Sequence, residues 1–230
     1  MLSLHHHPMS APGRFARLAL SEYEIEFTLI EQRLWERDTA FLTMNPLGSL
    51  PVLVEDARPA ICGYGPVSEY LDETRGTMAR ERRLLPEDPF ERAEARRLVD
   101  WYLGKLETDV TRYLVRERVE KLFMTHEQGG GSPDAATIRA ARANITYHMQ
   151  YSEWLAGTRS WLGGDQMSVA DLAAAAALSA LDYIGEVPFD DYPNLKDWYS
   201  RMKSRPSFRP LLAERLRGLQ PVPHYADLDF

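Results

Sequence analysis

The sequence predicts an α/β domain followed by an all-α helical domain. Strand-like and helix-like segments alternate in the first part of the chain, in the order β-α-β and then β-β-α. A polar, proline-marked stretch without a regular period follows at residues 74–87. Beyond it, apolar residues recur at helical spacing. We therefore divide the chain into an α/β domain at 1–78, a linker at 79–87, a helical domain at 88–217 and a tail at 218–230.

The first domain is expected to contain one small mixed sheet with helices packed against it. Residues 2–7 form its first strand, which stops at Pro8, and a helix with Pro12 in its first turn follows. The turn residues at 45–49 lead into a strand headed by Pro51, which is tolerated because a first strand residue need not donate a hydrogen bond to its neighbour. The other expected elements are strands at 26–30, 50–54 and 60–62 and a helix at 66–72.

The helical domain is marked by three helix starts. Residues 88–91 combine an N-cap acid, a proline at the first helical position and an acid three residues after the cap. This helix is expected to run to about Thr125, where a glycine-rich stretch follows, and residues 132–134 cap a second long helix. Ser168 and Asp171 are expected to form a capping box before an alanine-rich helix that is apolar on all sides and therefore buried.

The composition excludes several classes of function. The 230 residues carry a formal net charge of −7 and a pI near 5.4, which disfavours binding to nucleic acids or anionic membranes through overall charge. Cys62 is the only cysteine, so the chain forms no intramolecular disulfide and no cysteine-based metal cluster, and we predict no metal site. The histidines at residues 5–7 fall within a strand and are interpreted as structural. The lone cysteine suits a reducing compartment, so we expect a cytoplasmic protein, and no apolar run approaches the ~20 residues that cross a bilayer.

Three motifs, at suitable separations, resemble the cytosolic glutathione transferase superfamily. The first is Gly-Ser-Leu-Pro-Val-Leu at residues 48–53, the second is Ser-Val-Ala-Asp at 168–171, and the third extends over residues 192–208. The resemblance implies a thioredoxin-like N-terminal domain, a helical C-terminal domain and a homodimer. It also implies that the peptide bond between Leu50 and Pro51 is cis, which costs an X–Pro bond only ~0.5–1 kcal/mol.

The residues at the implied glutathione site depart from the superfamily's pattern. The resemblance places a thiolate-stabilising hydroxyl near the start of the first helix, where Ser10 is the only suitable one, although a plain N-cap role is the interpretation we favour for it. Superfamily members carry an acid and a serine for the γ-glutamyl end where Gly63 and Tyr64 stand here. Their absence removes hydrogen bonds to charged groups worth ~1.5–3 kcal/mol each. What remains is a backbone contact from Leu50, before Pro51.

Two segments are candidates for a protein-binding surface. Trp35 lies among charged residues and is either folded back as a local lid or offered to a partner, since tryptophan is over-represented among binding hot spots. Residues 226–230 alternate acidic and apolar side chains and resemble a linear motif, whereas residues 219–225 favour a strap packed across the helical domain. The predicted partner-binding residues are Trp35, Tyr225, Asp227, Leu228, Asp229 and Phe230.

The combination of the Gly63-Tyr64 replacement with this tail resembles the glutathione-transferase-like proteins of bacterial cell division. Those proteins bind the tubulin-like GTPase FtsZ and organise its filaments into curved bundles. The resemblance implies a non-enzymatic, dimeric adaptor at the division site that uses no cofactor, and a dimer suits this role because two copies of one surface can bridge a polymer. Two alternatives stay open: a divergent glutathione-dependent enzyme that uses Ser10 to activate the glutathione thiol, and an interaction domain for another partner.

Overall fold

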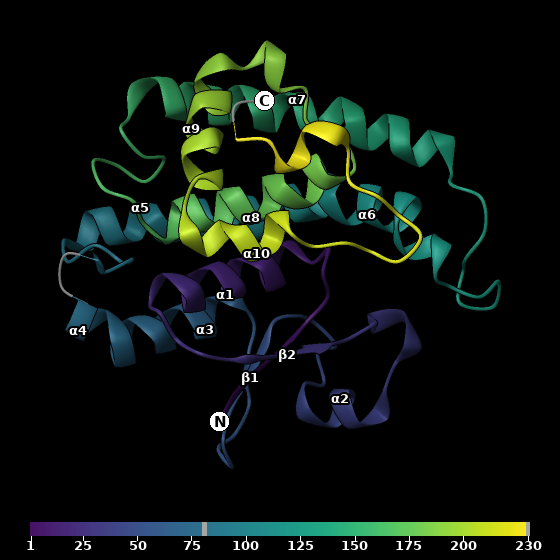
Figure 1. The fold of residues 1–230 in the computed structure, drawn as a ribbon, viewed down its shortest axis with the longest axis horizontal. Coiled ribbons are helices and arrows are strands. Elements are labelled where there is room, and N and C mark those ends of the chain that lie inside the picture. Colours follow the sequence, from purple (N-terminus) through teal and green to yellow (C-terminus); the bar gives the residue numbers. More distant parts are fainter. Residues whose placement is uncertain (80–81, 229–230) are drawn as a thin grey trace.

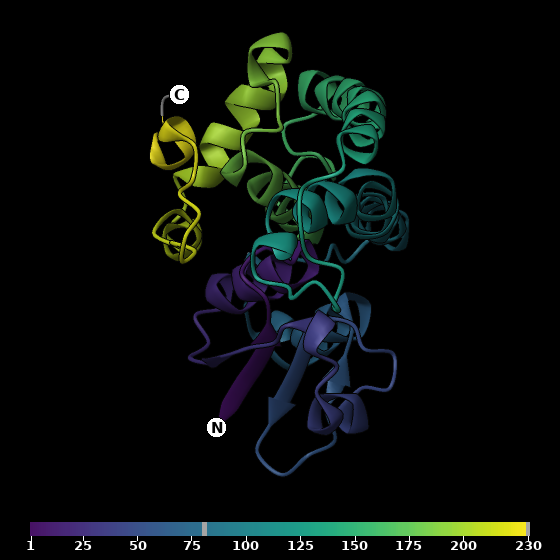
Figure 2. The same ribbon diagram turned by 90° about the vertical axis from the view of Figure 1, so that its right-hand side faces the viewer.

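The computed structural model describes residues 1–79 and 82–228 and shows two stacked domains. In Figures 1 and 2 the N-terminal sheet and its helices lie below a larger group of helices, which is formed by the rest of the chain. The fold class predicted from the sequence, a thioredoxin-like α/β domain followed by an all-helical domain, is confirmed.

The elements of the N-terminal domain follow the predicted order. They are β1 (Leu2–His6), α1 (Ala11–Glu22), β2 (Thr28–Glu31), the 3-10 turn η1 (Leu34–Glu36), α2 (Thr39–Met44), β3 (Val52–Glu55), β4 (Ile61–Cys62), α3 (Tyr64–Leu71), the π-helical turn η2 (Asp72–Gly76) and α4 (Thr77–Ala79). Among the described residues these strands form a four-stranded sheet in the order β2-β1-β3-β4, with β1 and β2 parallel and the other pairs antiparallel. The bond between Leu50 and Pro51 is cis, as the resemblance implied.

The helical domain is built around one long, kinked helical run and one buried helix. Its elements are α5 (Pro89–Asp100), the π turns η4 (Trp101–Lys105) and η5 (Glu107–Thr111), α6 (Arg112–Arg118), η6 (Glu120–Leu122), α7 (Ala135–Thr158), α8 (Val169–Tyr183), η7 (Phe189–Asp191), α9 (Pro193–Lys203), η8 (Pro206–Phe208), α10 (Arg209–Leu212) and η9 (Pro223–Ala226). The single helix expected from Asp88 to about Thr125 is therefore interrupted by two π turns and ends near Arg118.

The helix at the end of the N-terminal domain is longer than predicted. It begins at Tyr64, two residues before the expected start, and continues through η2 and α4 to Ala79, so that the first part of the stretch interpreted as irregular is helical. The physical reason lies in Asp72, whose buried carboxylate receives two bonds from Arg83, at 2.9 and 2.7 Å, and lies 3.4 Å from Arg92. These ion pairs neutralise the buried charge of Asp72. Their arginines lie further along the chain, so the local sequence pattern around Asp72 does not reveal them.

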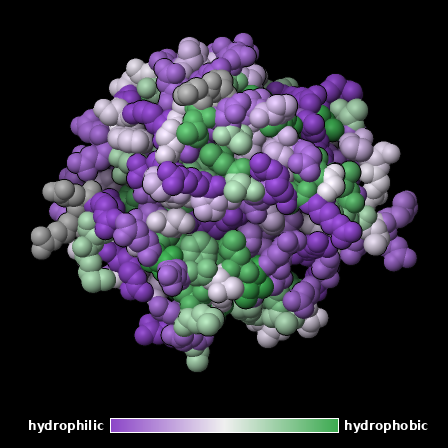
Figure 3. Space-filling model, viewed as in Figure 1, coloured by the Kyte–Doolittle hydropathy of each residue, from purple (hydrophilic) through white to green (hydrophobic). Residues whose placement is uncertain are grey.

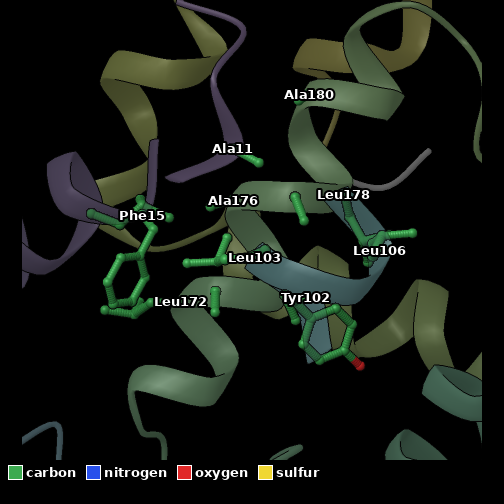
Figure 4. Close-up of a cluster of buried hydrophobic side chains, with 14 of the residues drawn as sticks. Ala11, Phe15, Tyr102, Leu103, Leu106, Leu172, Ala176, Leu178 and Ala180 are labelled. Carbon is green, nitrogen blue, oxygen red and sulfur yellow. The ribbon is translucent and has the colours of Figure 1, made fainter. Parts of the chain in front are cut away.

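The two domains share a hydrophobic core because α1 packs against α8. Figure 4 shows Ala11 and Phe15 of α1 in one cluster with Leu172 and Ala176 of α8, to which η4 adds Tyr102 and Leu103. Every residue of α8 is buried, as its all-round apolar sequence predicted. The sheet and the helical domain are thus one packed unit, and α1 is the element that joins them.

Ser168 and Asp171 form the predicted capping box at the start of α8. The Ser168 side chain accepts a bond from the Ala170 N–H at 3.2 Å, and Asp171 accepts from the Ser168 N–H at 3.0 Å. Asp171 also accepts from the backbone N–H of Leu162 at 2.8 Å and from the indole N–H of Trp198 at 2.9 Å. One carboxylate therefore fixes the start of α8, the preceding loop and α9 together.

The surface is mostly hydrophilic, as Figure 3 shows for the face drawn in Figure 1. Hydrophobic residues gather on this face over the N-terminal domain, near β1 and β2, where Leu29 and Ile30 of β2 are exposed. Within the described ranges, no helix is long and apolar enough to span a membrane.

Candidate functional site

A cleft of about 340 Å³ lies between the two domains, beside the N-terminus of α1. The N-terminal domain contributes the β1–α1 loop, the η1 region and the residue before the cis proline, and the helical domain contributes the segment from η5 to η6. Its lining residues are His7, Met9, Ser10, Gln32, Leu34, Trp35, Leu50, Glu107, Arg112, Tyr113, Val115, Arg116 and Glu120. A larger polar hollow of about 650 Å³, between the linker and residues 163–168, contains none of the predicted site residues.

Ser10 lies at the mouth of this cleft as the N-cap of α1. Its hydroxyl oxygen accepts the backbone N–H of Gly13 at 3.1 Å, and Pro12 occupies the first turn. The N-cap role predicted for Ser10 is therefore confirmed. Leu50, before the cis proline, lines the same cleft, so two of the five residues of the implied glutathione site face it.

Gly63 and Tyr64 stand where the strand β4 meets α3, as predicted. Gly63 is the N-cap of α3 at a φ of 93°, a backbone conformation that favours glycine, and it offers no side chain to a ligand. The hydroxyl of Tyr64 donates to Asp100 of α5 at 3.2 Å. Tyr64 thus contacts the helical domain, and neither residue is among those that line the cleft.

Trp35 is folded back onto the β1–α1 loop. Its ring meets the ring of His7 edge-on, with 5.4 Å between centroids and 75° between planes, and the residue is half-buried. Burial lowers the pKa of His7 to about 4, so that the imidazole is neutral at physiological pH. The folded-back alternative therefore describes the position of Trp35, and this position forms one wall of the cleft.

The cleft also contains two acids that were not among the predicted site residues, Glu107 and Glu120. Burial, and then the neighbouring charge of Glu120, raise the pKa of Glu107 to about 7, while Arg112 acts in the opposite direction. Burial likewise raises the pKa of Glu120. The sequence offers no signal for Glu107; in the structure it begins the π turn η5, and π turns inside helices are frequent at functional sites.

The raised pKa of Glu107 makes the free energy of unfolding depend on pH in a definite direction. The folded protein binds the Glu107 proton more tightly than the unfolded chain, so the stabilisation from this proton is complete below the usual glutamate pKa of about 4.3 and is lost as the pH rises through about 7. At neutral pH the site therefore holds an acid at a cost to stability, which is typical of a group retained for binding or chemistry.

The tail packs against the protein up to Tyr225, and the described residues after Tyr225 are exposed. Tyr225 has no exposed surface, and its hydroxyl accepts a bond from Arg14 at 3.1 Å and donates to the backbone oxygen of Leu211 at 3.1 Å. The prediction that Tyr225 contacts a partner directly is therefore wrong, because the strap alternative for residues 219–225 describes the structure. Asp227 and Leu228 are exposed and stay predicted contacts, whereas Asp229 and Phe230 lie outside the described residues.

The comparisons with known proteins agree with this architecture. Residues 13–74 match the glutathione S-transferase N-terminal domain, and residues 116–206 match the C-terminal domain. FtsZ-localized protein A of Caulobacter vibrioides is 44% identical over 231 residues, which cover 99% of this chain and 98% of that protein. The chain belongs to the glutathione S-transferase superfamily.

Solved structures of this superfamily superpose on the whole chain. The glutathione S-transferase from Sinorhizobium meliloti 1021 is 61% identical, with a TM-score of 0.98 and complete coverage of both chains. FzlA from C. crescentus is 44% identical, with a TM-score of 0.91 over 100% of this chain and 99% of that one. The glutathione S-transferase fold is therefore shared over the full length, including the tail that packs across the helical domain.

Proposed function

We propose that this protein is a non-enzymatic, dimeric adaptor that binds FtsZ filaments at the division site and promotes their curvature and bundling. The observation that carries the proposal is the 44% identity over nearly the whole chain with a protein named for its localisation with FtsZ. The chemistry of the site supports it, because Gly63 and Tyr64 do not supply the acid and serine that would hold the γ-glutamyl end of glutathione. The cleft then serves as a surface for a protein partner, with Trp35 as its aromatic anchor.

The same proposal includes a homodimer, formed through an aromatic surface on α7. Tyr147, Tyr151 and Trp154 follow one another at helical spacing on one face, and Tyr147 and Trp154 are 60% and 55% exposed. Trp101 of η4 packs against Tyr147 and Tyr151, with centroids 5.6 and 4.7 Å apart. Exposed aromatic patches of this kind mark interfaces, and a two-fold dimer pairs such a patch with its own copy.

The dimer is tested by placing a charged side chain in this aromatic surface. Trp154→Glu is expected to convert the dimer to a monomer in sedimentation equilibrium, because a buried unpaired carboxylate in each copy disfavours association. Leu122→Glu, at a side chain that is 56% exposed on η6, is the matched control and should leave the dimer intact. A Trp154→Glu protein that stays dimeric would place the interface elsewhere.

Binding to FtsZ is tested by co-sedimentation with GTP-loaded FtsZ filaments. The wild-type protein should pellet with the filaments and increase their curvature in electron micrographs. Trp35→Ala should weaken filament binding about thirtyfold or more, because hot-spot tryptophans contribute about 2 kcal/mol or more. Its melting transition should shift little, since the half-buried ring packs mainly on His7.

Two results would count against the adaptor. The first is wild-type protein that leaves FtsZ pelleting and filament shape unchanged at stoichiometric concentration. The second is micromolar glutathione binding in calorimetry that Ser10→Ala abolishes. That result would support the alternative of a divergent glutathione S-transferase, in which the cleft-facing Ser10 activates the thiol.

A further inference from the structure

The cleft contains two buried polar atoms that have no hydrogen-bond partner among the described residues. They are Nε1 of Trp35 and Oε2 of Glu107, and the two residues line the cleft from opposite domains. Buried polar groups in folded proteins are almost always paired, so an unpaired donor and an unpaired acceptor in one cleft indicate a ligand that pairs with both. Such a ligand must offer a hydrogen-bond acceptor to the indole and a donor to the carboxylate.

The charges around Glu107 favour a cationic donor. In the part of the chain that the structure describes, neither Glu107 nor Glu120 forms an ion pair within 4 Å. Arg112, which weakly opposes the raised pKa of Glu107, instead donates to the hydroxyl of Tyr113 at 2.6 Å, with its guanidinium 4.6 Å from the centre of that ring. Arg112 and Arg116 line the same cleft, but among the described residues neither forms an ion pair with Glu107 or Glu120, so both carboxylates can accept an added cation.

The walls around these groups suit a long side chain. Met9, Leu34 and Val115 supply apolar surface, and the indole of Trp35 supplies a flat aromatic face. Aromatic faces attract ammonium and guanidinium groups, and the apolar stems of lysine and arginine cover such surfaces readily.

We propose that the cleft binds a basic residue of an extended peptide segment, with its side-chain cation on the carboxylates of Glu107 and Glu120 and its backbone carbonyl on the indole N–H of Trp35. The proposal rests on the proposed function, since it names the chemistry by which the partner is recognised. Arginine is the better match, because its planar guanidinium can donate to two carboxylates at once.

The test uses the peptide acetyl-Gly-Arg-Gly-amide as the probe and the full-length protein as the receptor. Binding is followed by the indole N–H resonance of Trp35, which is identified by its loss in Trp35→Phe. Replacing arginine by uncharged citrulline is expected to weaken binding about tenfold or more, and Glu107→Gln should do the same. Glu127→Gln, at an exposed acid in the loop after η6, is the matched control and should bind as the wild type does.

The pH dependence separates this ionic contact from simple packing. The titratable and charged side chains that line the cleft with Glu107 are Glu120 of η6, Arg112, Tyr113 and Arg116 of α6, and His7 of the β1–α1 loop. The pKa of His7 is lowered to about 4, so His7 stays neutral above about pH 6. Arginine-peptide binding should therefore strengthen between about pH 6 and about pH 8, as Glu107 ionises, and Glu107→Gln should remove most of this dependence.

Besides a failure of the arginine peptide to bind, three outcomes would overturn the proposal. They are equal binding of the arginine and citrulline peptides, wild-type affinity in Glu107→Gln, and glutathione binding to the same resonance more tightly than the arginine peptide. Filament co-sedimentation is scored separately: peptide binding without FtsZ pelleting would overturn the adaptor function and leave the basic-residue site standing. FtsZ pelleting that is unchanged in Glu107→Gln, with no peptide binding, would overturn the site and leave the adaptor function.

Discussion

Replacing Asp171 by alanine is expected to lower the free energy of unfolding by about 4 kcal/mol, because the change leaves several buried donors without an acceptor. The carboxylate of Asp171 is fully buried and accepts the backbone N–H groups of Leu162 and Ser168 and the indole N–H of Trp198. Water cannot replace these bonds in a closed core. Urea unfolding followed by circular dichroism measures the loss directly.

Asp134 provides a matched control on the same kind of helix start. It is the N-cap of α7, where it accepts the Ala136 N–H at 2.9 Å and the Thr137 hydroxyl at 2.7 Å, but it is exposed. Asp134→Ala should therefore destabilise the protein much less than Asp171→Ala, since water can solvate the freed groups. Equal losses at Asp171 and Asp134 would mean that the buried network adds nothing beyond ordinary capping.

Local signals explain why so much of the fold could be predicted from the sequence. The caps at Asp88, Asp134 and Ser168 depend on residues within three positions of one another, and all three were placed correctly. The alternation of strands and helices in the first domain is equally local. The resemblance of the motif at residues 48–53 added the cis bond, which no periodicity reports.

The parts that could not be predicted depend on contacts between distant residues. The helix continues past Asp72 because Arg83 and Arg92 neutralise its buried carboxylate. Glu107 was missed because nothing in its neighbourhood distinguishes it from the many exposed acids of amphipathic helices, and only the approach of the two domains places it in one cleft with Trp35. Of the candidate site, the sequence therefore indicated Ser10, Leu50 and Trp35 but not the acids opposite them.

The tail was also only partly predictable, since its sequence does not reveal which residue is the last one that packs against the helical domain. Tyr225 is held by Arg14 of α1, a fully buried arginine that has no carboxylate partner in the described ranges. Arg14 instead donates to the backbone oxygen of Pro8 at 2.6 Å and to the hydroxyl of Ser179 at 2.8 Å. The tail thus supplies part of the environment that keeps a buried charge satisfied, close to the loop that carries Ser10.

Two truncations of the tail are therefore expected to differ sharply. Ending the chain at Arg217 removes Tyr225 and should destabilise the protein by about 3–5 kcal/mol, because a buried aromatic ring is lost and Arg14 loses a hydrogen-bond partner in the core. Ending it at Tyr225 removes only the residues beyond the strap and should change the free energy of unfolding by about 0.5 kcal/mol or less. Thermal and urea unfolding of both proteins measures the contrast.

The truncations also separate the two roles that the tail can play. If the residues after Tyr225 form a partner motif, the chain ending at Tyr225 keeps its stability and its FtsZ pelleting falls. The position of Leu228, which is 42% exposed next to exposed Asp227, agrees with such a motif. A large loss of stability in this shorter truncation would mean that the terminal residues belong to the strap. Tyr225→Phe separates the contribution of the Tyr225 ring from that of its hydroxyl. The variant keeps the ring against Tyr183 and removes the hydroxyl that accepts a hydrogen bond from Arg14.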